Sequence, residues 1–234
     1  MASHPSRIEG ARLLDKFIAS PSASHVTFRS ASTGALSSMR TLLQLIAVFA
    51  VALLLGISSA RYMIEHGSPL TTKRVGPWAS WMSEGNPNSD PYTKAHLARS
   101  GRLPLTSTTA RYFTTNTDSE GDTLTSDCEY SIEGGALNAR WWSLAVYDEH
   151  GSLIENPSQR YSFNSEEAVR HSDGSYRITL ASNARPENWL PSGTGPERNL
   201  VLMLRVYSPR EIDSSGIGQI ADDRLPKIER KSCN

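Results

Sequence analysis

The stretch NLVLMLRVY, residues 199–207, decides the fold class, because it is apolar at nearly every position. A strand of this kind is covered on both faces, so we expect it to lie in the middle of a sheet. Arg205 is its one charged residue, and a charge in such a strand must be paired or reach solvent. The sequence offers Asp148 or Glu133 as an ion-pair partner for Arg205, and an anionic ligand as the alternative.

Short alternating runs earlier in the chain predict further strands joined by polar turns. In residues 141–147, the alternation places Trp142 and Leu144 on one face and Trp141 and Tyr147 on the other. Many short strands with little helix predict a mainly β domain, a sandwich or a barrel. The other strands are expected at residues 110–115, 128–132, 152–154, 160–163 and 175–181.

Two short helices are expected beside these strands. Asp90 is suited to cap the first helix and Pro91 to occupy its first position, and Gly101 ends it. Ser165, which two glutamates follow, predicts a second helix that reaches about His171.

A long apolar run, MRTLLQLIAVFAVALLLGISSAR, lies far upstream at residues 39–61. Twenty residues between its two arginines carry no charge, which is about the length that crosses 30 Å of hydrocarbon. A buried core helix would show a polar face, and a cleavable signal, although Ser58, Ser59 and Ala60 suit a peptidase, would be shorter. We therefore expect a single transmembrane anchor at residues 41–60, with removal as a signal as the alternative.

The flanks of this run predict its orientation. Lysine and arginine outnumber acidic residues before it, and cytoplasmic flanks keep such cations. We expect a single-pass protein of the inner membrane whose C-terminal domain is periplasmic. Residues 1–38 hold nine serines and no apolar period, which is typical of a disordered tail, unless translation begins at Met39.

The segment beyond the anchor has a mixed composition. Residues 61–234 hold 19 Lys and Arg against 22 Asp and Glu, a net charge of −3 without a basic stripe, so a nucleic-acid partner is not expected. Residues 61–89 are rich in Gly, Pro, Ser and Trp and are assigned to a linker, which leaves residues 90–234 for the β domain.

Two cysteines, Cys128 and Cys233, fall on the side of the anchor expected to be exported. An even number of cysteines in an oxidising compartment favours a disulfide between them. The alternative is two unrelated thiols, one in the core and one near the end of the chain.

Sequence motifs for catalysis are missing. The chain has no Gly-x-Ser-x-Gly elbow, phosphate loop or dinucleotide-binding glycines, and its six histidines lack metal-ligand spacing. We therefore assign no catalytic residue, cofactor or metal. A pair of glycosidase carboxylates would leave no spacing signal.

Five residues remain as candidates for ligand binding: Arg160, Tyr161, Asn188, Trp189 and Arg205. In the expected loop at residues 188–191, Trp189 would stack on a ligand and Asn188 would hydrogen-bond it. The structural alternative is a plug, in which the indole covers the end of the sandwich and the amide satisfies the turn. Arg160 and Tyr161 are expected in a pair at a strand edge, or as ligand contacts.

These residues occur in an order similar to that of the bacterial "domain of unknown function 1214" family. The resemblance covers residues 61–234 and is carried by Trp141 to Asp148, Asn156-Pro157, Arg160-Tyr161, Asn188 to Pro191 and Leu204 to Pro209. Asp90-Pro91-Tyr92, Leu103-Pro104-Leu105 and the two cysteines resemble its short, membrane-anchored branch.

The resemblance implies a jelly-roll-like antiparallel β-sandwich and no established reaction. Longer members carry a companion domain, numbered 1254, ahead of this one, so the resemblance implies that a separate protein of the 1254 family is the partner here. A binding module of the cell envelope is the resulting hypothesis. A binder of, or enzyme acting on, an envelope carbohydrate or glycan is the alternative, by analogy of fold.

Overall fold

The computed structural model describes residues 32–212, 218–220 and 222–233. The chain forms two compact units, Met1–Ala52 and Leu53–Asn234. Most of the segment for which a disordered tail or a later start was predicted, residues 1–31, lies outside the described residues.

Helix α1 (Ser32–His66) contains the long apolar run. Within Ser38–His66, the most apolar stretch of 18 residues has a mean hydropathy of 2.4, and none of its residues is buried. Apolar side chains that pack against nothing in the described part of the chain argue against a core helix. The helix is long and apolar enough to cross a membrane, as predicted.

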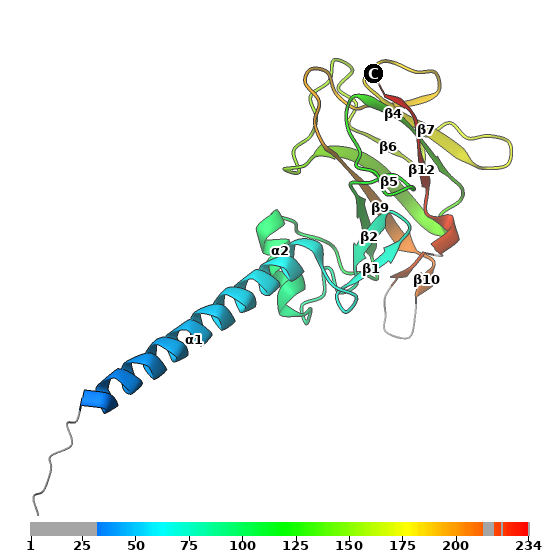
Figure 1. Ribbon diagram of the computed structural model, residues 1–234. Coiled ribbons are helices and arrows are strands. Elements are labelled where there is room, and N and C mark those ends of the chain that lie inside the picture. The colour runs from blue at the N-terminus through cyan, green and yellow to red at the C-terminus, as the bar shows by residue number, and fades with distance from the viewer. Residues whose placement is uncertain (1–31, 213–217, 221, 234) are drawn as a thin grey trace, which may run out of the picture. The chain divides into compact units, whose positions relative to one another are not determined.

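The larger sheet has six antiparallel strands in the order β1-β2-β3-β9-β5-β6 (Figure 1). Strand β9 lies between β3 and β5, so the apolar stretch that decides the fold is central, as expected. The strands are β1 (Thr72–Val75), β2 (Trp78–Trp81), β3 (Ala110–Thr115), β9 (Leu200–Pro209), β5 (Ala139–Asp148) and β6 (Ser162–Asn164).

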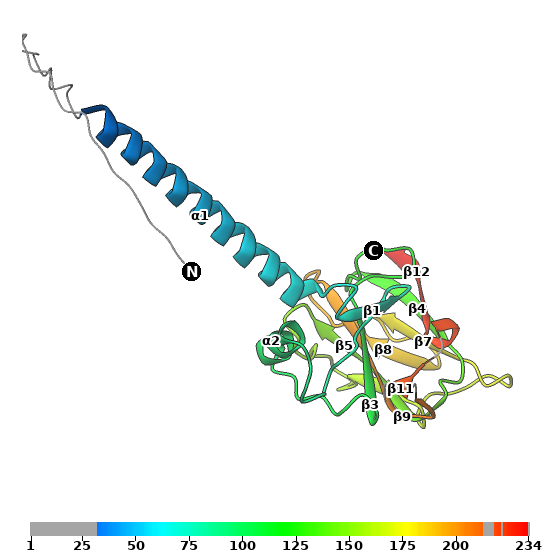
Figure 2. The ribbon, with the colours of Figure 1, turned by 90° about the horizontal axis from the view of Figure 1, so that it is seen from below.

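The smaller sheet has four strands in the order β12-β4-β7-β8, with β12 and β4 side by side (Figure 2). Its strands are β12 (Lys227–Cys233), β4 (Cys128–Gly134), β7 (Tyr176–Ala181) and β8 (Asn188–Pro191). Strands β7 and β8 are parallel, which departs from the all-antiparallel sandwich that was expected. The remaining elements are helix α2 (Pro91–Ser100), β10 (Glu211–Ile212), β11 (Gly218–Gln219) and a 3-10 turn, η1 (Asp222–Arg224).

One hydrophobic core lies between the two sheets. Trp142, Leu144 and Val146 of β5 are buried in it, as the alternation predicted. The Trp142 ring stacks on Tyr176 of the smaller sheet, with 4.6 Å between ring centroids. The mainly β class with two packed sheets is therefore confirmed.

The segment assigned to a linker, residues 61–89, belongs in part to the β domain. Strands β1 and β2 pair within it, and Ala79 of β2 pairs with Thr114 of β3. Trp78 is buried, and its indole Nε1 donates a hydrogen bond to the Pro226 carbonyl oxygen across 2.7 Å. Each of these strands has four residues, and Gly76 and Pro77 separate them. Strands this short do not show a clear alternating pattern.

The second helix, predicted from Ser165 to about His171, is a single turn instead. The side-chain oxygen of Asn164 accepts the amides of Glu166 and Glu167 at 2.9 and 3.0 Å. The Val169 amide donates to the side chain of Asn188 across 2.7 Å, so the next helical hydrogen bond is not formed. Of the strand predicted at residues 152–154, one bridge from Leu153 to Tyr147 is present.

Candidate functional site

Helix α2 begins and ends where the sequence predicted. The Asp90 side chain accepts the amides of Tyr92 and Thr93 at 2.9 and 3.0 Å, and Pro91 takes the first helical position. Gly101 ends the helix with a φ of +64°, a conformation that favours glycine. These signals fix where the chain leaves α2, and therefore where Arg102 lies.

Helix α2 contacts the last turn of α1, and both segments belong to the C-terminal unit (Figure 1). His96 Nδ1 is 2.9 Å from the Ile64 carbonyl oxygen, and Arg99 pairs with Glu65 across 3.1 Å. A carbonyl oxygen only accepts, so Nδ1 carries the proton. Burial lowers the pKa of His96, and its Nε2 is buried without a hydrogen-bond partner among the described residues.

The outer face of the larger sheet, opposite the core, carries a row of large polar side chains. Arg205 of β9 lies opposite Tyr112 of β3 and Ser143 of β5 in the strand register. Tyr147 and Tyr207 lie on the same outer face, because each directly follows a core residue, Val146 or Val206, in its strand. This face forms the floor of a depression.

Two adjoining hollows share Arg102, Met203 and Arg205 in their walls. The first, of about 500 Å³, extends to Ile64 and Glu65 at the end of α1. The second, of about 350 Å³, extends to Glu84 and is also lined by residues 103–105. We call the two hollows together the arginine groove.

Arg205 is held in the arginine groove by a tyrosine, and no carboxylate of the described residues pairs with it. Its Nη2 donates a hydrogen bond to the Tyr147 hydroxyl across 2.7 Å. Both partners predicted for it are engaged elsewhere: Glu133 pairs with Arg177 across 2.8 Å, and Asp148 accepts two amides of its own turn. The predicted ion pair is therefore wrong.

Arg102 adds a second guanidinium to the same groove. Burial lowers its pKa, Glu84 acts in the opposite direction, and the nearby charge of Arg205 lowers it further. Among the residues that the structure describes, no carboxylate lies within ion-pair distance of Arg102 or Arg205. These two neighbouring guanidinium groups are suited to bind an anion. Glu65, Asp148 and Glu149 also line the first hollow, and Glu84 lines the second.

Glu84 closes one end of the groove and is only 4% exposed. Burial raises its pKa from 4.5 to about 7, although Arg102 and Arg111 act in the opposite direction. Its Oε1 has no hydrogen-bond partner in the described part of the chain. Near neutral pH this carboxyl is therefore partly protonated, so it offsets the charge of Arg102 only in part.

The next residue, Gly85, allows the wall of the groove to close. Its φ is +75°, and a Cβ at this position would overlap the Leu105 carbonyl oxygen. The Leu105 amide in turn donates to the Tyr112 hydroxyl across 3.1 Å. The segment after α2 is thereby held against both Glu84 and the sheet.

Asn188 and Trp189 have their polar atoms occupied by the backbone. The Asn188 amide is buried and bonds to Val169 through both N and O and to the Arg177 carbonyl oxygen, at 2.7 to 2.9 Å. The Trp189 indole donates to the Ala181 carbonyl oxygen across 2.9 Å. Both residues lie in strand β8 rather than in a loop. These contacts are those of a structural plug.

The structure does not bring the five predicted ligand-binding residues together. Arg160 Nη1 lies 3.4 Å from the Trp189 carbonyl oxygen, and its guanidinium lies 4.9 Å from the centre of the Phe163 ring. Tyr161 accepts the Val146 amide through its backbone. Neither hollow that Arg205 lines includes any of the other four.

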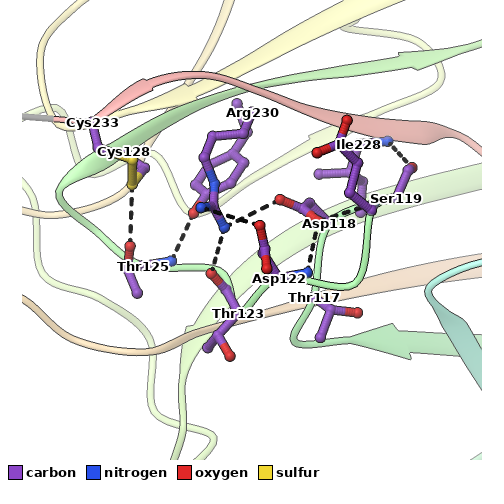
Figure 3. Close-up of polar contacts among 12 residues, drawn as sticks. Thr117, Asp118, Ser119, Asp122, Thr123, Thr125, Cys128, Ile228, Arg230 and Cys233 are labelled. Atoms are coloured by element: carbon purple, nitrogen blue, oxygen red, sulfur yellow. Dashed lines mark hydrogen bonds and ion pairs between the residues drawn. A yellow bond between two sulfur atoms is a disulfide. The ribbon is translucent and has the colours of Figure 1, made fainter.

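The predicted disulfide between Cys128 and Cys233 is present, and it joins β4 to β12 (Figure 3). Beside it, Arg230 pairs with the buried Asp118 across 3.2 Å and with Asp122 across 3.5 Å. These contacts fix the last strand against the turn that precedes β4. Nowhere among the described residues do three or more His, Cys, Asp or Glu form a group that would hold a metal.

Comparison with known proteins finds one matching family model and several similar solved structures. Residues 109–211 match the family model described as "Protein of unknown function (DUF1214)". The crystal structure of the VPA0106 protein from Vibrio parahaemolyticus is similar, with a TM-score of 0.48 and 23% identity over 62% of this chain and 36% of that one. A putative uncharacterized protein from Burkholderia cenocepacia has a TM-score of 0.33 and 18% identity over 53% and 30%. The chain thus spans about a third of the length of these structures, and no curated protein matches it.

Proposed function

Since residues 109–211 match the DUF1214 family, we propose that this is a single-pass membrane protein of the bacterial envelope whose β-sandwich is a binding module. Its ligand carries a phosphate or carboxylate and is bound in the arginine groove. The observation that carries this proposal is that Arg102 and Arg205 line one depression without a carboxylate partner among the described residues.

The position of the tyrosines supports binding of an anion with a polar body. Tyr147 orients the Arg205 guanidinium, and Tyr112 and Tyr207 line the same hollow. A planar guanidinium donates two parallel hydrogen bonds to a phosphate or carboxylate. An anionic envelope lipid and an anionic glycan both have this chemistry, whereas the earlier candidates Asn188 and Trp189 use their side-chain polar atoms internally.

Charge and redox chemistry support the proposed location. The cationic flank before α1 favours a cytoplasmic N-terminal side and a periplasmic domain in the inner membrane. The disulfide agrees with an oxidising compartment.

The partner proposed from the family resemblance is a protein of the 1254 family, and purification of the native chain in mild detergent tests it. Recovery of the chain alone would contradict this partnership.

Calorimetric titration of the detergent-solubilised full chain tests the groove. The probes are glycerol 3-phosphate and galacturonate, which carry a phosphate and a carboxylate. The double variant Arg102→Gln/Arg205→Gln should lose about tenfold or more in affinity, since two charge-assisted contacts are removed. Arg198→Gln is the control, because the Arg198 side chain bonds to the Thr194 carbonyl oxygen in a different loop. Equal affinity in the double variant, or no binding of either probe at millimolar concentration, would overturn the proposal.

A further inference from the structure

The arginine groove lies beside the end of the apolar helix. Ile64 and Glu65 of α1 line it together with Arg102 and Arg205. The contact of His96 with the Ile64 carbonyl oxygen and the pair of Arg99 with Glu65 hold α2, which precedes Arg102, against this last turn. All of these residues belong to the C-terminal unit.

Helix geometry gives the depth of the groove relative to a bilayer. The uncharged residues 41–60 span about 30 Å as a helix, which equals the thickness of the hydrocarbon core. Ile64 follows four residues later, about 6 Å further along the axis. The polar layer on each side of the hydrocarbon is about 5–7 Å thick. Ile64, which lines the groove, therefore lies at the depth of lipid headgroups when α1 spans a membrane.

The side chains next to the groove suit the same depth. Leu103, which directly follows Arg102, is 99% exposed, and Leu70, shortly after α1, is 85% exposed. Tyr62, on the last turns of α1, is also exposed, and tyrosine is enriched at membrane interfaces. A neighbouring hollow of about 560 Å³ is lined by Tyr62, Met63 and Met82, among others. Apolar side chains beside half-buried cations match an amphiphile rather than a wholly soluble anion.

We infer that the groove binds the phosphate headgroup of an anionic membrane lipid whose acyl chains remain in the bilayer. This inference rests on the proposed function and names its ligand class. Arg102 and Arg205 bind the phosphate, Tyr147 positions Arg205, and Leu103 and Ile64 contact the part of the lipid nearest the hydrocarbon. A free phosphate compound has the same charged group but none of the apolar contacts.

Photo-crosslinking tests the inference with the full chain reconstituted in phosphatidylcholine nanodiscs. A small fraction of phosphatidylglycerol carries a photo-activatable group, and cross-linked peptides are mapped by mass spectrometry. We expect cross-links to residues 96–105 in the unchanged chain, and a roughly fivefold or larger loss in Arg102→Gln/Arg205→Gln. Arg198→Gln should keep them. Cross-links to residues 41–60 report contact with bulk lipid and should be equal in every variant.

Three results separate this inference from the proposed function. Cross-links at residues 96–105 that depend on the two arginines support a lipid ligand. Cross-links that do not depend on them, combined with glycerol 3-phosphate binding that does, overturn the lipid assignment and leave the binding module intact. If neither the lipid nor the soluble probes respond to the arginines, both proposals fail.

Discussion

The hydroxyl of Tyr147 accepts a hydrogen bond from Arg205 across 2.7 Å, and it takes the place of the carboxylate expected for this arginine. The tyrosine fixes the guanidinium without cancelling its charge. We expect Tyr147→Phe to weaken glycerol 3-phosphate binding by roughly fivefold, or about 1 kcal/mol, because Arg205 loses its orientation. Calorimetric titration measures this change.

The matched control for this variant is Tyr161→Phe, because the Tyr161 side chain lies outside both hollows of the groove. It should bind the probe as the unchanged chain does. A Tyr147→Phe variant with full affinity would mean that the hydroxyl does not position Arg205.

Glu84 should make stability depend on pH. Its pKa is about 7 in the folded protein and near 4.5 when unfolded, so the folded state binds the proton more tightly. The free energy of unfolding should therefore fall as pH rises from about 4.5 to about 7, by at most roughly 3 kcal/mol, and stay level above that range. Glu84→Gln should remove this slope and be more stable than the unchanged chain at pH 8. Denaturant titrations at several pH values measure it.

The exposed Glu197 serves as the comparison for Glu84. Glu197→Gln should leave the pH dependence of unfolding unchanged. The assignment fails if Glu84→Gln retains the full slope between pH 5 and pH 7.

Gly85 should tolerate alanine poorly, because the new Cβ would overlap the Leu105 carbonyl oxygen in addition to straining a positive φ. Gly76 is the matched control: its φ is +54°, but a Cβ there meets nothing within 4 Å. Gly76→Ala should cost about 1 kcal/mol, from the backbone alone. Gly85→Ala should cost clearly more and weaken anion binding, as measured by thermal unfolding and titration. Equal losses in the two variants would show that the wall of the groove adjusts freely.

The disulfide closes a loop over a sequence separation of 105 residues. The chain-entropy model gives such a bond at most about 4–5 kcal/mol, so Cys128→Ser/Cys233→Ser should lower the melting temperature by roughly 10 °C. Strand β12 should still pair with β4, since Arg230 keeps its contacts with Asp118 and Asp122. Thermal unfolding with and without reductant provides the control, because reductant should destabilise the unchanged chain and leave the double variant unaffected.

Much of the fold follows from local patterns in the sequence. The central place of β9 comes from its continuous apolar run, and the face of each β5 residue comes from simple alternation. The bounds of α2 follow from Asp90, Pro91 and Gly101, whose roles depend only on neighbouring backbone. Strands β1, β2 and β8 were missed because four residues carry too little pattern.

The candidate site follows from the sequence only at Arg205. Its other main members, Glu84, His96, Arg102 and Tyr112, come from three different segments and meet only through tertiary packing. Glu84 lies in the segment assigned to a linker, where a single carboxylate gives no signal of burial. Arg102 had one clue: it directly follows the glycine that ends α2, a position fixed by the helix.

The last turn of α1 is bonded to α2, and this has a kinetic consequence. When α1 spans a membrane, as proposed, a site bonded to its last turn explores its surroundings by lateral diffusion in two dimensions. A lipid at a few per cent of the leaflet is then present at a local concentration far above that of a dissolved metabolite. Weak intrinsic affinity would suffice for occupancy, so the lipid composition of the leaflet, rather than tight recognition, would control how often the groove is filled.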